Sequence, residues 1–238
     1  MPEPRVFRQS RFTTPPGACE LVLVRHGESE PLVEGRPFPL VDGHGDPALA
    51  PEGEVQAERV GERLSNEPIA AIYVTTLRRT HQTAAPLAAR LGLTPIVEPD
   101  LREVHLGEWE GELYRKHMAE GHPLALKVIS EQRWDAIPGA EAAHSISTRV
   151  RGALDRIVTA HPDQCVTIFS HGGIIGEVLA QVADARRPFA FLGASNASIS
   201  QVVAFSGRWI MRRFNDTAHL AGDLDRDDLD PVPQLPGT

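Results

Sequence analysis

The sequence is poor in cysteine, in aromatic residues and in long apolar runs. Of its 238 residues only Cys19 and Cys165 are cysteines, and 5% are aromatic. Two cysteines fit neither a disulfide framework nor a metal-binding spacing, so we expect two reduced thiols and a cytoplasmic location. No apolar run approaches the roughly 18 residues of a membrane-spanning helix, so a membrane role is not expected.

Basic residues are also in deficit. The chain has 24 Lys and Arg against 32 Asp and Glu, for a formal net charge of −8. A nucleic-acid-binding protein normally displays a basic stripe, so nucleic acid is not an expected partner and any anion site must be local. The composition is 41% hydrophobic and 24% charged, which is typical of a folded chain with a substantial core.

The two ends of the chain differ in composition from the rest. Residues 1–18 are rich in Pro, Arg and Thr without periodicity, and residues 221–238 are acidic and contain proline. We predict a flexible leader and a flexible tail there. No repeat or long linker interrupts residues 19–220, which we predict to form a single domain. The sequence does not set the oligomeric state, and it leaves a homodimer open.

Strand-like and helix-like segments alternate along the chain. Apolar, branched runs predict buried strands at 20–24, 70–75 and 165–169. Helical spacing predicts helices at 51–66, 78–92, 146–161 and 174–182, with Pro86 expected to kink or end the second. A strand at 94–98, an irregular helical stretch at 110–135 and a β-hairpin at 199–214 complete the prediction. The expected fold is α/β, a three-layer sandwich whose mostly parallel central sheet carries helices on both faces.

Two histidine–glycine turns follow two of the predicted strands. The segment RHG at 25–27 ends the first strand, and SHGG at 170–173 ends the strand at 165–169. In open α/β sheets ligands bind beyond the carboxyl ends of the strands, where helix N-termini direct backbone N–H groups at anions. The sequence therefore indicates an anion site built from both turns.

Phosphoryl transfer without a cofactor needs a nucleophile, cations for the phosphoryl oxygens and an acid for the leaving oxygen. Neutral imidazole is a competent nucleophile near pH 7, and a partner on its other ring nitrogen would fix its tautomer. A lone histidine after a strand is more often structural, but the paired turns favour function for His26 and His171. Spacing alone leaves Glu103, Glu108 and Glu110 open as the acid.

The segment LVRHGES at 23–29 resembles the signature of the histidine phosphatase superfamily, which contains the cofactor-dependent phosphoglycerate mutases. Further segments resemble that family in the same order, at 46–57, 76–84, 101–111 and 170–173, with a weaker match at 138–141. The resemblance covers roughly residues 20–220. It implies a phosphoglycerate mutase-like fold of the branch 1 phosphatases.

The resemblance also implies roles for single residues. His26 would attack phosphorus, and Glu103 would donate a proton and later activate water. The phosphoryl oxygens would be bound by Arg25, Arg79 and His171, with further substrate contacts from Gly172, Ser29 and Arg36. The implied activity is a phosphoric monoester hydrolase with a phosphohistidine intermediate, acting on a small phosphorylated metabolite. No cofactor and no metal are expected, because the histidine spacings fit no metal site and the arginines would repel a cation.

Two alternatives stay open. A phosphoglycerate mutase-type phosphotransferase is one, although the family's mutases carry a longer insertion than the stretch between Glu103 and Pro138. The other is a catalytically weak phosphate-binding relative, suggested by Leu32, which stands where the family often has asparagine. Arg78 is expected in a surface ion pair and His44 as an ordinary polar loop residue. Surface positions are expected for His81, His117, His122, His144 and His161.

Overall fold

The computed structural model describes residues 5–220, so the tail expected at 221–238 and the first residues of the leader lie outside the described part. A six-stranded sheet has the order β5-β4-β6-β1-β7-β8. Strands β5, β4, β6 and β1 run parallel, and β7 is antiparallel to β1 and to β8. The prediction of a mostly parallel sheet is confirmed. The strands are β1 Cys19–Arg25, β4 Ile69–Val74, β5 Ile96–Val97, β6 Cys165–Ser170, β7 Ile199–Phe205 and β8 Arg208–Asp216.

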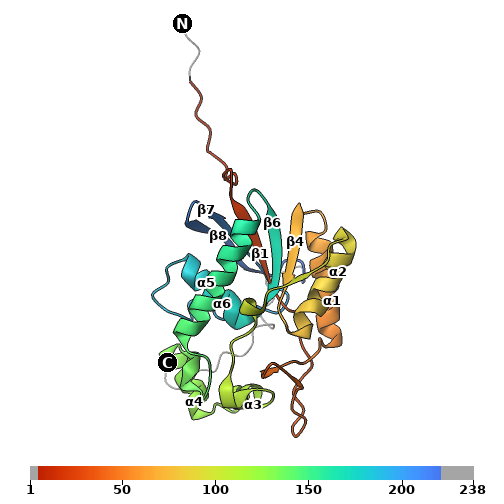
Figure 1. Cartoon of the computed structure of the whole chain (residues 1–238), viewed down its shortest axis with the longest axis vertical. Helices are drawn as coiled ribbons and strands as arrows, with labels where there is room; N and C mark the ends of the chain where they lie inside the picture. The colour runs from red at the N-terminus through yellow and green to blue at the C-terminus, as the bar shows by residue number, and fades with distance from the viewer. Residues whose placement is uncertain (1–4, 221–238) are drawn as a thin grey trace.

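Helices cover both faces of this sheet, as expected. Helices α1 (Pro51–Leu64) and α2 (Arg78–Leu91) lie on one face, and α5 (Ala143–Ala160) and α6 (Gly172–Val182) on the other (Figure 1). Side chains of β1 alternate between the two cores: Leu21 and Leu23 pack in the α5/α6 cluster, and Val22 and Val24 in the α1/α2 cluster. A strand buried on both faces explains why this segment reads as a continuous apolar run.

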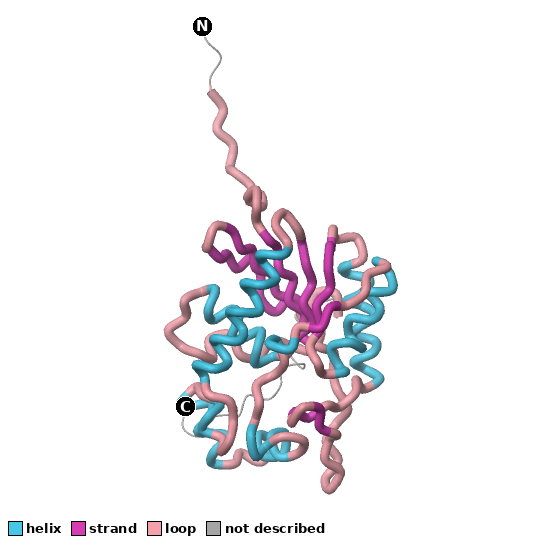
Figure 2. Tube along the Cα trace, viewed as in Figure 1, coloured by secondary structure: helices cyan, strands magenta, loops and turns pink. Residues whose placement is uncertain are grey.

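The stretch predicted to be irregular forms two short helices beyond the carboxyl ends of the strands. Helices α3 (Leu113–Ala119) and α4 (Pro123–Glu131) lie below the sheet in Figure 1, and Figure 2 shows the loops that connect them to it. Trp109, Val128 and Ile137 form a small separate core there. Three short 3₁₀ helices complete this part, at Pro99–Leu101, Gly107–Trp109 and Trp134–Ala136.

Two turns and one proline show how local sequence affects the elements. Ser206 and Gly207 have φ of 47° and 72°, the left-handed pair that a two-residue hairpin turn requires, so the predicted hairpin is correct. Asp42 and Gly43 have φ of 48° and 81° and join β2 (Leu40–Val41) to β3 (His44–Gly45). This second hairpin was not predicted, although Asp-Gly is a strong hairpin signal. Pro86 lies inside α2, so the expectation that it could end the helix is wrong.

The described part of the leader runs away from the start of β1, at the opposite end of the sheet from α3 (Figure 1). The Arg212 guanidinium lies 3.8 Å from the centroid of the Phe12 ring, while Val6 and Phe7 are exposed. Within residues 5–220 no helix combines the length and hydrophobicity needed to cross a membrane.

Candidate active site

His26 follows the end of β1 and is held through both its main chain and its ring. Its amide donates to the Ser170 carbonyl at 3.0 Å, and its carbonyl accepts from the Ala197 amide and from Asn196 Nδ2. Ring atom Nδ1 lies 2.7 Å from the Gly27 carbonyl oxygen. A carbonyl can only accept, so Nδ1 carries the proton and Nε2 keeps its lone pair. This is the tautomer that a nucleophilic Nε2 needs.

His171 lies beside His26 because β1 and β6 pair in register, with Arg25 opposite Ser170. The two imidazole centroids are 5.2 Å apart at an interplanar angle of 60°. His171 is fully buried, and its Nε2 lies 3.0 Å from Thr75 Oγ1 at the end of β4. Its Nδ1 has no hydrogen-bond partner among residues 5–220. A buried polar atom left in this state is suited to bind a ligand oxygen.

Two arginines approach the histidine pair from different elements. Arg79, in the first turn of α2, is buried and donates from Nη1 to the Gly45 carbonyl at 3.0 Å. Burial lowers the pKa of Arg79 to about 10, while the carboxylates of Glu103 and Asp46 favour its charge. Arg79 therefore remains a cation near neutral pH. Arg25 donates from Nη1 to the Ala194 carbonyl at 2.6 Å.

Gly172 lies in van der Waals range of the Arg25 guanidinium. A Cβ placed on Gly172 would lie 3.4 Å from Arg25 Nε and 3.6 Å from Arg25 Cζ. Gly172 is also the first residue of α6, so the guanidinium packs against the N-terminal end of that helix, where backbone N–H groups favour anions.

Burial and positive charge keep both imidazoles neutral. The pKa of His26 lies well below its ordinary value because of burial first, and then because of Arg79 and Arg25. The pKa of His171 is lowered by burial, then by Arg79, His26 and Arg25. Near pH 7 the two rings therefore act as neutral groups beside two guanidinium cations.

Glu103 lies next to this cluster, at the start of α6. Its Oε2 accepts from the Gly173 amide at 3.3 Å and its Oε1 from the Val104 amide at 3.0 Å. The two rival carboxylates have different contacts. Glu108 is exposed, and Glu110 accepts at 2.8 Å from each of the amides of Gly45 and Leu106. The charges of Glu103 and Glu110 both act on Arg79, but only Glu103 accepts from the amide of Gly173, two residues after His171.

A third arginine near the site was not predicted from the sequence. Arg115, on α3, donates from Nη2 to Ser29 Oγ and from Nη1 to the Glu30 carbonyl, both at 2.7 Å. Its guanidinium carbon lies 4.9 Å from the centroid of the Phe38 ring. Its charge contributes to the lowered pKa of His26. No local signal marks Arg115, because its place depends on how α3 folds back over the nucleophile loop.

Ser29 and Arg36, which were predicted to contact the substrate, differ in burial. Ser29 is buried and bound to Arg115, while Arg36 is exposed, with its amide closing a turn on the Val33 carbonyl. His44 is not an ordinary loop residue: it is buried, and its ring lies 5.0 Å from that of His105.

Other polar residues were expected at the surface. Arg78 is exposed and forms an ion pair, but its partner Asp46, 3.0 Å away, is buried, so the pair is not the fully solvated one that was expected. His81 and His144 are exposed. The surface expectation is wrong for His117 and His122, which are partly buried with rings 4.8 and 5.6 Å from Trp109.

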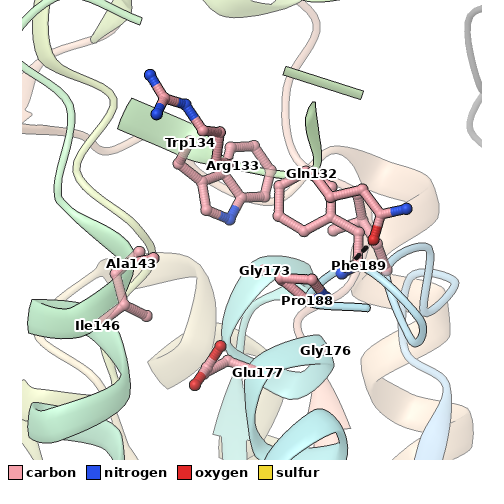
Figure 3. A pocket seen from close by; sticks show the side chains of 11 residues that line it. Gln132, Arg133, Trp134, Ala143, Ile146, Gly173, Gly176, Glu177, Pro188 and Phe189 are labelled. Atoms are coloured by element: carbon pink, nitrogen blue, oxygen red, sulfur yellow. Dashed lines mark hydrogen bonds between the residues drawn. The ribbon is translucent and has the colours of Figure 1, made fainter. Parts of the chain in front are cut away.

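A small cavity adjoins the site on the α6 side. Its volume is about 20 Å³, enough for roughly one water molecule. Figure 3 shows the Glu177 carboxylate, the Trp134 indole and the Phe189 ring around it. Gly173, whose amide binds Glu103, also lines this cavity.

The arrangement has the parts for phosphoryl transfer. It provides a neutral imidazole with its lone pair on Nε2, two cations, a second imidazole whose Nδ1 has no partner among residues 5–220, and a carboxyl group. Among residues 5–220, no three or more His, Cys, Asp or Glu side chains are grouped as a metal site requires.

Comparison with known proteins agrees with this geometry. Residues 21–217 match the family described as the histidine phosphatase superfamily, branch 1. Phosphoglycerate mutase-like protein 4 of Arabidopsis thaliana is 34% identical over 85% of this chain and 87% of its own. Metal-independent phosphoserine phosphatase of the same plant is 32% identical over 85% and 83%. The solved structure of mycobacterial glucosyl-3-phosphoglycerate phosphatase has a TM-score of 0.71 at 28% identity, over 84% of this chain and 100% of that one. This chain belongs to branch 1 of the histidine phosphatase superfamily.

Proposed function

We propose that this protein is a phosphatase that hydrolyses a small phosphomonoester through a phosphohistidine on His26. The observation that carries the proposal is the 2.7 Å contact between His26 Nδ1 and the Gly27 carbonyl. It leaves the Nε2 lone pair available, and the lowered pKa of His26 keeps that lone pair unprotonated near neutral pH.

In the first step His26 Nε2 forms a bond to phosphorus as the ester P–O bond breaks. The leaving oxygen takes a proton from the Glu103 carboxyl group, and the Nδ1–H of the phosphorylated ring stays on the Gly27 carbonyl. Arg25, Arg79 and His171 Nδ1 bind the phosphoryl oxygens, which carry the charge of the transition state. Gly172 lies beside them as the first residue of α6.

In the second step water attacks phosphorus and the N–P bond breaks, which returns neutral His26. Glu103 is then a carboxylate and takes the proton from the attacking water. The free enzyme must carry Glu103 protonated and His26 neutral. We therefore expect a bell-shaped dependence of kcat/KM on pH, with an optimum from acidic to neutral pH.

The positive charge of the site comes from protein side chains. Arg25 and Arg79 stand where a metal ion would otherwise neutralise phosphate, and they would repel such an ion. The reaction is thus proposed to be metal-independent. Activity should be unchanged after treatment with EDTA.

The relatives support hydrolysis without naming the substrate of this chain. One similar protein is a metal-independent phosphoserine phosphatase and another is a glucosyl-3-phosphoglycerate phosphatase. Both of these phosphatases are named for phosphorylated small molecules, and we propose the same substrate class here. Ser29 and Arg36 lie in the loop after the nucleophile, where they are proposed to contact the non-phosphate part of such a substrate.

The test is phosphate release from p-nitrophenyl phosphate by the wild type and by His26→Ala. We expect the variant to lose activity by about a thousandfold or more, since it lacks the nucleophile. His144→Ala, which changes an exposed histidine on α5, should retain the wild-type rate. Equal rates in the wild type and His26→Ala would refute the proposal.

A mutase is the second candidate, because a similar protein carries the description of a phosphoglycerate mutase-like protein. The two functions differ in the fate of the phosphoryl group on His26. Enzyme phosphorylated with a radioactive phosphoryl group should release inorganic phosphate at the same rate with and without added phosphoglycerate. Transfer of the label to phosphoglycerate faster than to water would identify a mutase.

A further inference from the structure

A buried arginine on α5 holds the segment that carries Glu103. Arg149 Nη1 donates to the carbonyls of Asp100 at 2.6 Å and Arg102 at 2.8 Å, and Nη2 donates to the carbonyl of Glu103 itself at 3.3 Å. One guanidinium thus binds three carbonyls of four successive residues. The five N–H donors of the planar guanidinium can bind these carbonyls and still bind a further partner, whereas a lysine ammonium has only three donors.

Glu141 completes this contact from the other side. Its carboxylate accepts from Arg149 Nε at 2.7 Å and from Nη2 at 2.9 Å. Both side chains are largely buried, with 11% of Arg149 and 17% of Glu141 exposed. Burial opposes the charged form of Glu141, but the hydrogen bonds from Arg149 hold its pKa below the ordinary value. The pair is therefore ionised and mutually neutralised at neutral pH.

Glu141 also binds the main chain just after Glu103. The Glu141 amide donates to the His105 carbonyl at 2.8 Å, and the His105 amide lies 3.4 Å from Glu141 Oε2. The segment from Asp100 to His105 is consequently fixed before, at and after Glu103. The Glu103 side chain is free of this pair and reaches the Gly173 amide instead.

We propose that Arg149 and Glu141 are positioning residues that hold Glu103 at the distance where it can protonate the leaving oxygen. The inference rests on the proposed function, in which Glu103 is the acid. Neither residue touches the phosphoryl site formed by His26, His171, Arg25 and Arg79. Their loss should weaken proton donation and leave phosphate binding intact, because a carboxyl group displaced by even 1 Å transfers a proton poorly.

The chain provides a matched control on the same helix. Arg156 also binds this segment, from Nη2 to Glu98 Oε1 at 2.8 Å and to Asp100 Oδ2 at 2.7 Å. Its side chain is 54% exposed, and its side-chain partners in this segment, Glu98 and Asp100, both precede Glu103. Arg156→Met removes an arginine that binds the same loop, without removing a contact to the Glu103 carbonyl.

The test compares phenyl, p-nitrophenyl and 2,4-dinitrophenyl phosphate, whose leaving phenols become progressively more acidic. A weakly acidic phenol needs the proton from Glu103, and a strongly acidic phenol leaves without it. In Arg149→Met we expect kcat/KM to fall by about tenfold to a hundredfold for phenyl phosphate and by less than about threefold for 2,4-dinitrophenyl phosphate. Arg149→Lys and Glu141→Gln should show the same trend, and Arg156→Met should match the wild type. The dissociation constant of inorganic phosphate should stay within about twofold in every variant.

An equal loss for all three esters, or no loss, would overturn the inference, since a general structural defect does not depend on the leaving group. If Arg149→Met does not fold, Arg149→Lys and Glu141→Gln decide by the same comparison. If hydrolysis by the wild type does not require His26, the proposed function is overturned, and this inference with it. Parallel losses in an active enzyme would overturn the positioning role alone.

Discussion

Thr75 Oγ1 lies 3.0 Å from His171 Nε2, so a threonine at the end of one strand contacts the histidine at the end of the next. Thr75 Oγ1 also accepts from the Leu77 amide at 3.2 Å and lies 3.2 Å from Thr80 Oγ1. The Thr80 hydroxyl donates to the Leu77 carbonyl, which leaves the Thr75 hydrogen for Thr80 or for His171. When it goes to His171 Nε2, the proton of that ring is on Nδ1, where it can bind a phosphoryl oxygen.

We expect Thr75→Val to lower kcat/KM for p-nitrophenyl phosphate by about tenfold, the effect typical of a lost partner that orients a functional histidine. Valine keeps the shape and removes the hydroxyl. Thr75→Ser keeps the hydroxyl and should stay within about threefold of the wild type. The ¹⁵N chemical shifts of His171 measure the tautomer directly, and an unchanged tautomer in Thr75→Val would contradict this account.

Much of the fold could be predicted from the sequence because the central strands β1 and β6 are short, apolar and buried on both faces. A histidine lies two residues after the run at 20–24 and two residues after the run at 165–169, and parallel pairing of these strands brings His26 and His171 together. The short β2–β3 hairpin escaped prediction because each strand has only two residues. A pattern of alternation cannot be read from so few positions.

The site was less predictable where it depends on tertiary contacts. Glu103, Glu108 and Glu110 could not be separated by spacing, because all three lie within one irregular stretch. The structure separates them through the Gly173 amide, which binds Glu103, and the Gly45 amide, which binds Glu110. Arg115 and Arg149 carried no sequence signal for the same reason: their partners are backbone carbonyls far away along the chain.

The two buried histidines should make stability depend on pH. Their pKa values are lowered in the folded protein, and in the unfolded chain each takes up a proton near pH 6.5. Below that pH the unfolded state binds more protons, so stability falls as pH falls and rises as pH rises. Each histidine should remove about 1 kcal/mol between pH 7 and pH 5.5.

Urea unfolding of the wild type and His26→Asn at pH 7 and pH 5.5 measures this effect. Asparagine has no proton to take up, so the variant should lose about 1 kcal/mol less than the wild type over this interval. The quantity compared is the change in the free energy of unfolding between pH 7 and pH 5.5. A difference in stability between the two proteins that is the same at both pH values does not affect it. Equal losses in both proteins would show that His26 is protonated in the folded state.

Arg115 adds positive charge next to the nucleophile, and its removal should weaken substrate binding. We expect Arg115→Met to raise KM for p-nitrophenyl phosphate by about threefold or more and to reduce the dependence of kcat/KM on salt. The pKa of His26 should rise, because Arg115 lowers it. Lys116→Met is the control, since Lys116 pairs with exposed Glu34. A KM within error of the wild type would place Arg115 outside the binding site.

Gly173 offers a way to move Glu103 without touching either the nucleophile or the arginines. A Cβ at this position would lie 2.7 Å from Glu103 Oε1 and 3.3 Å from Val104 Cγ2. The first of these atoms is the end of a flexible side chain, so the carboxylate moves and the backbone stays. Gly173 is the second residue of α6, and alanine favours a helix over glycine by up to about 1 kcal/mol, so Gly173→Ala should fold about as stably as the wild type.

The activity of Gly173→Ala should nevertheless fall, by about tenfold or more in kcat, because the Glu103 carboxyl group leaves its position at the start of α6. Gly152→Ala provides the matched control: it makes the same change inside α5, where the nearest atom to the new Cβ is Arg156 Nη1 at 3.5 Å. It should raise the free energy of unfolding and leave kcat unchanged. Thermal unfolding and initial rates on both variants separate the two effects, and a Gly173→Ala enzyme with the wild-type kcat would mean that the position of Glu103 does not limit the reaction.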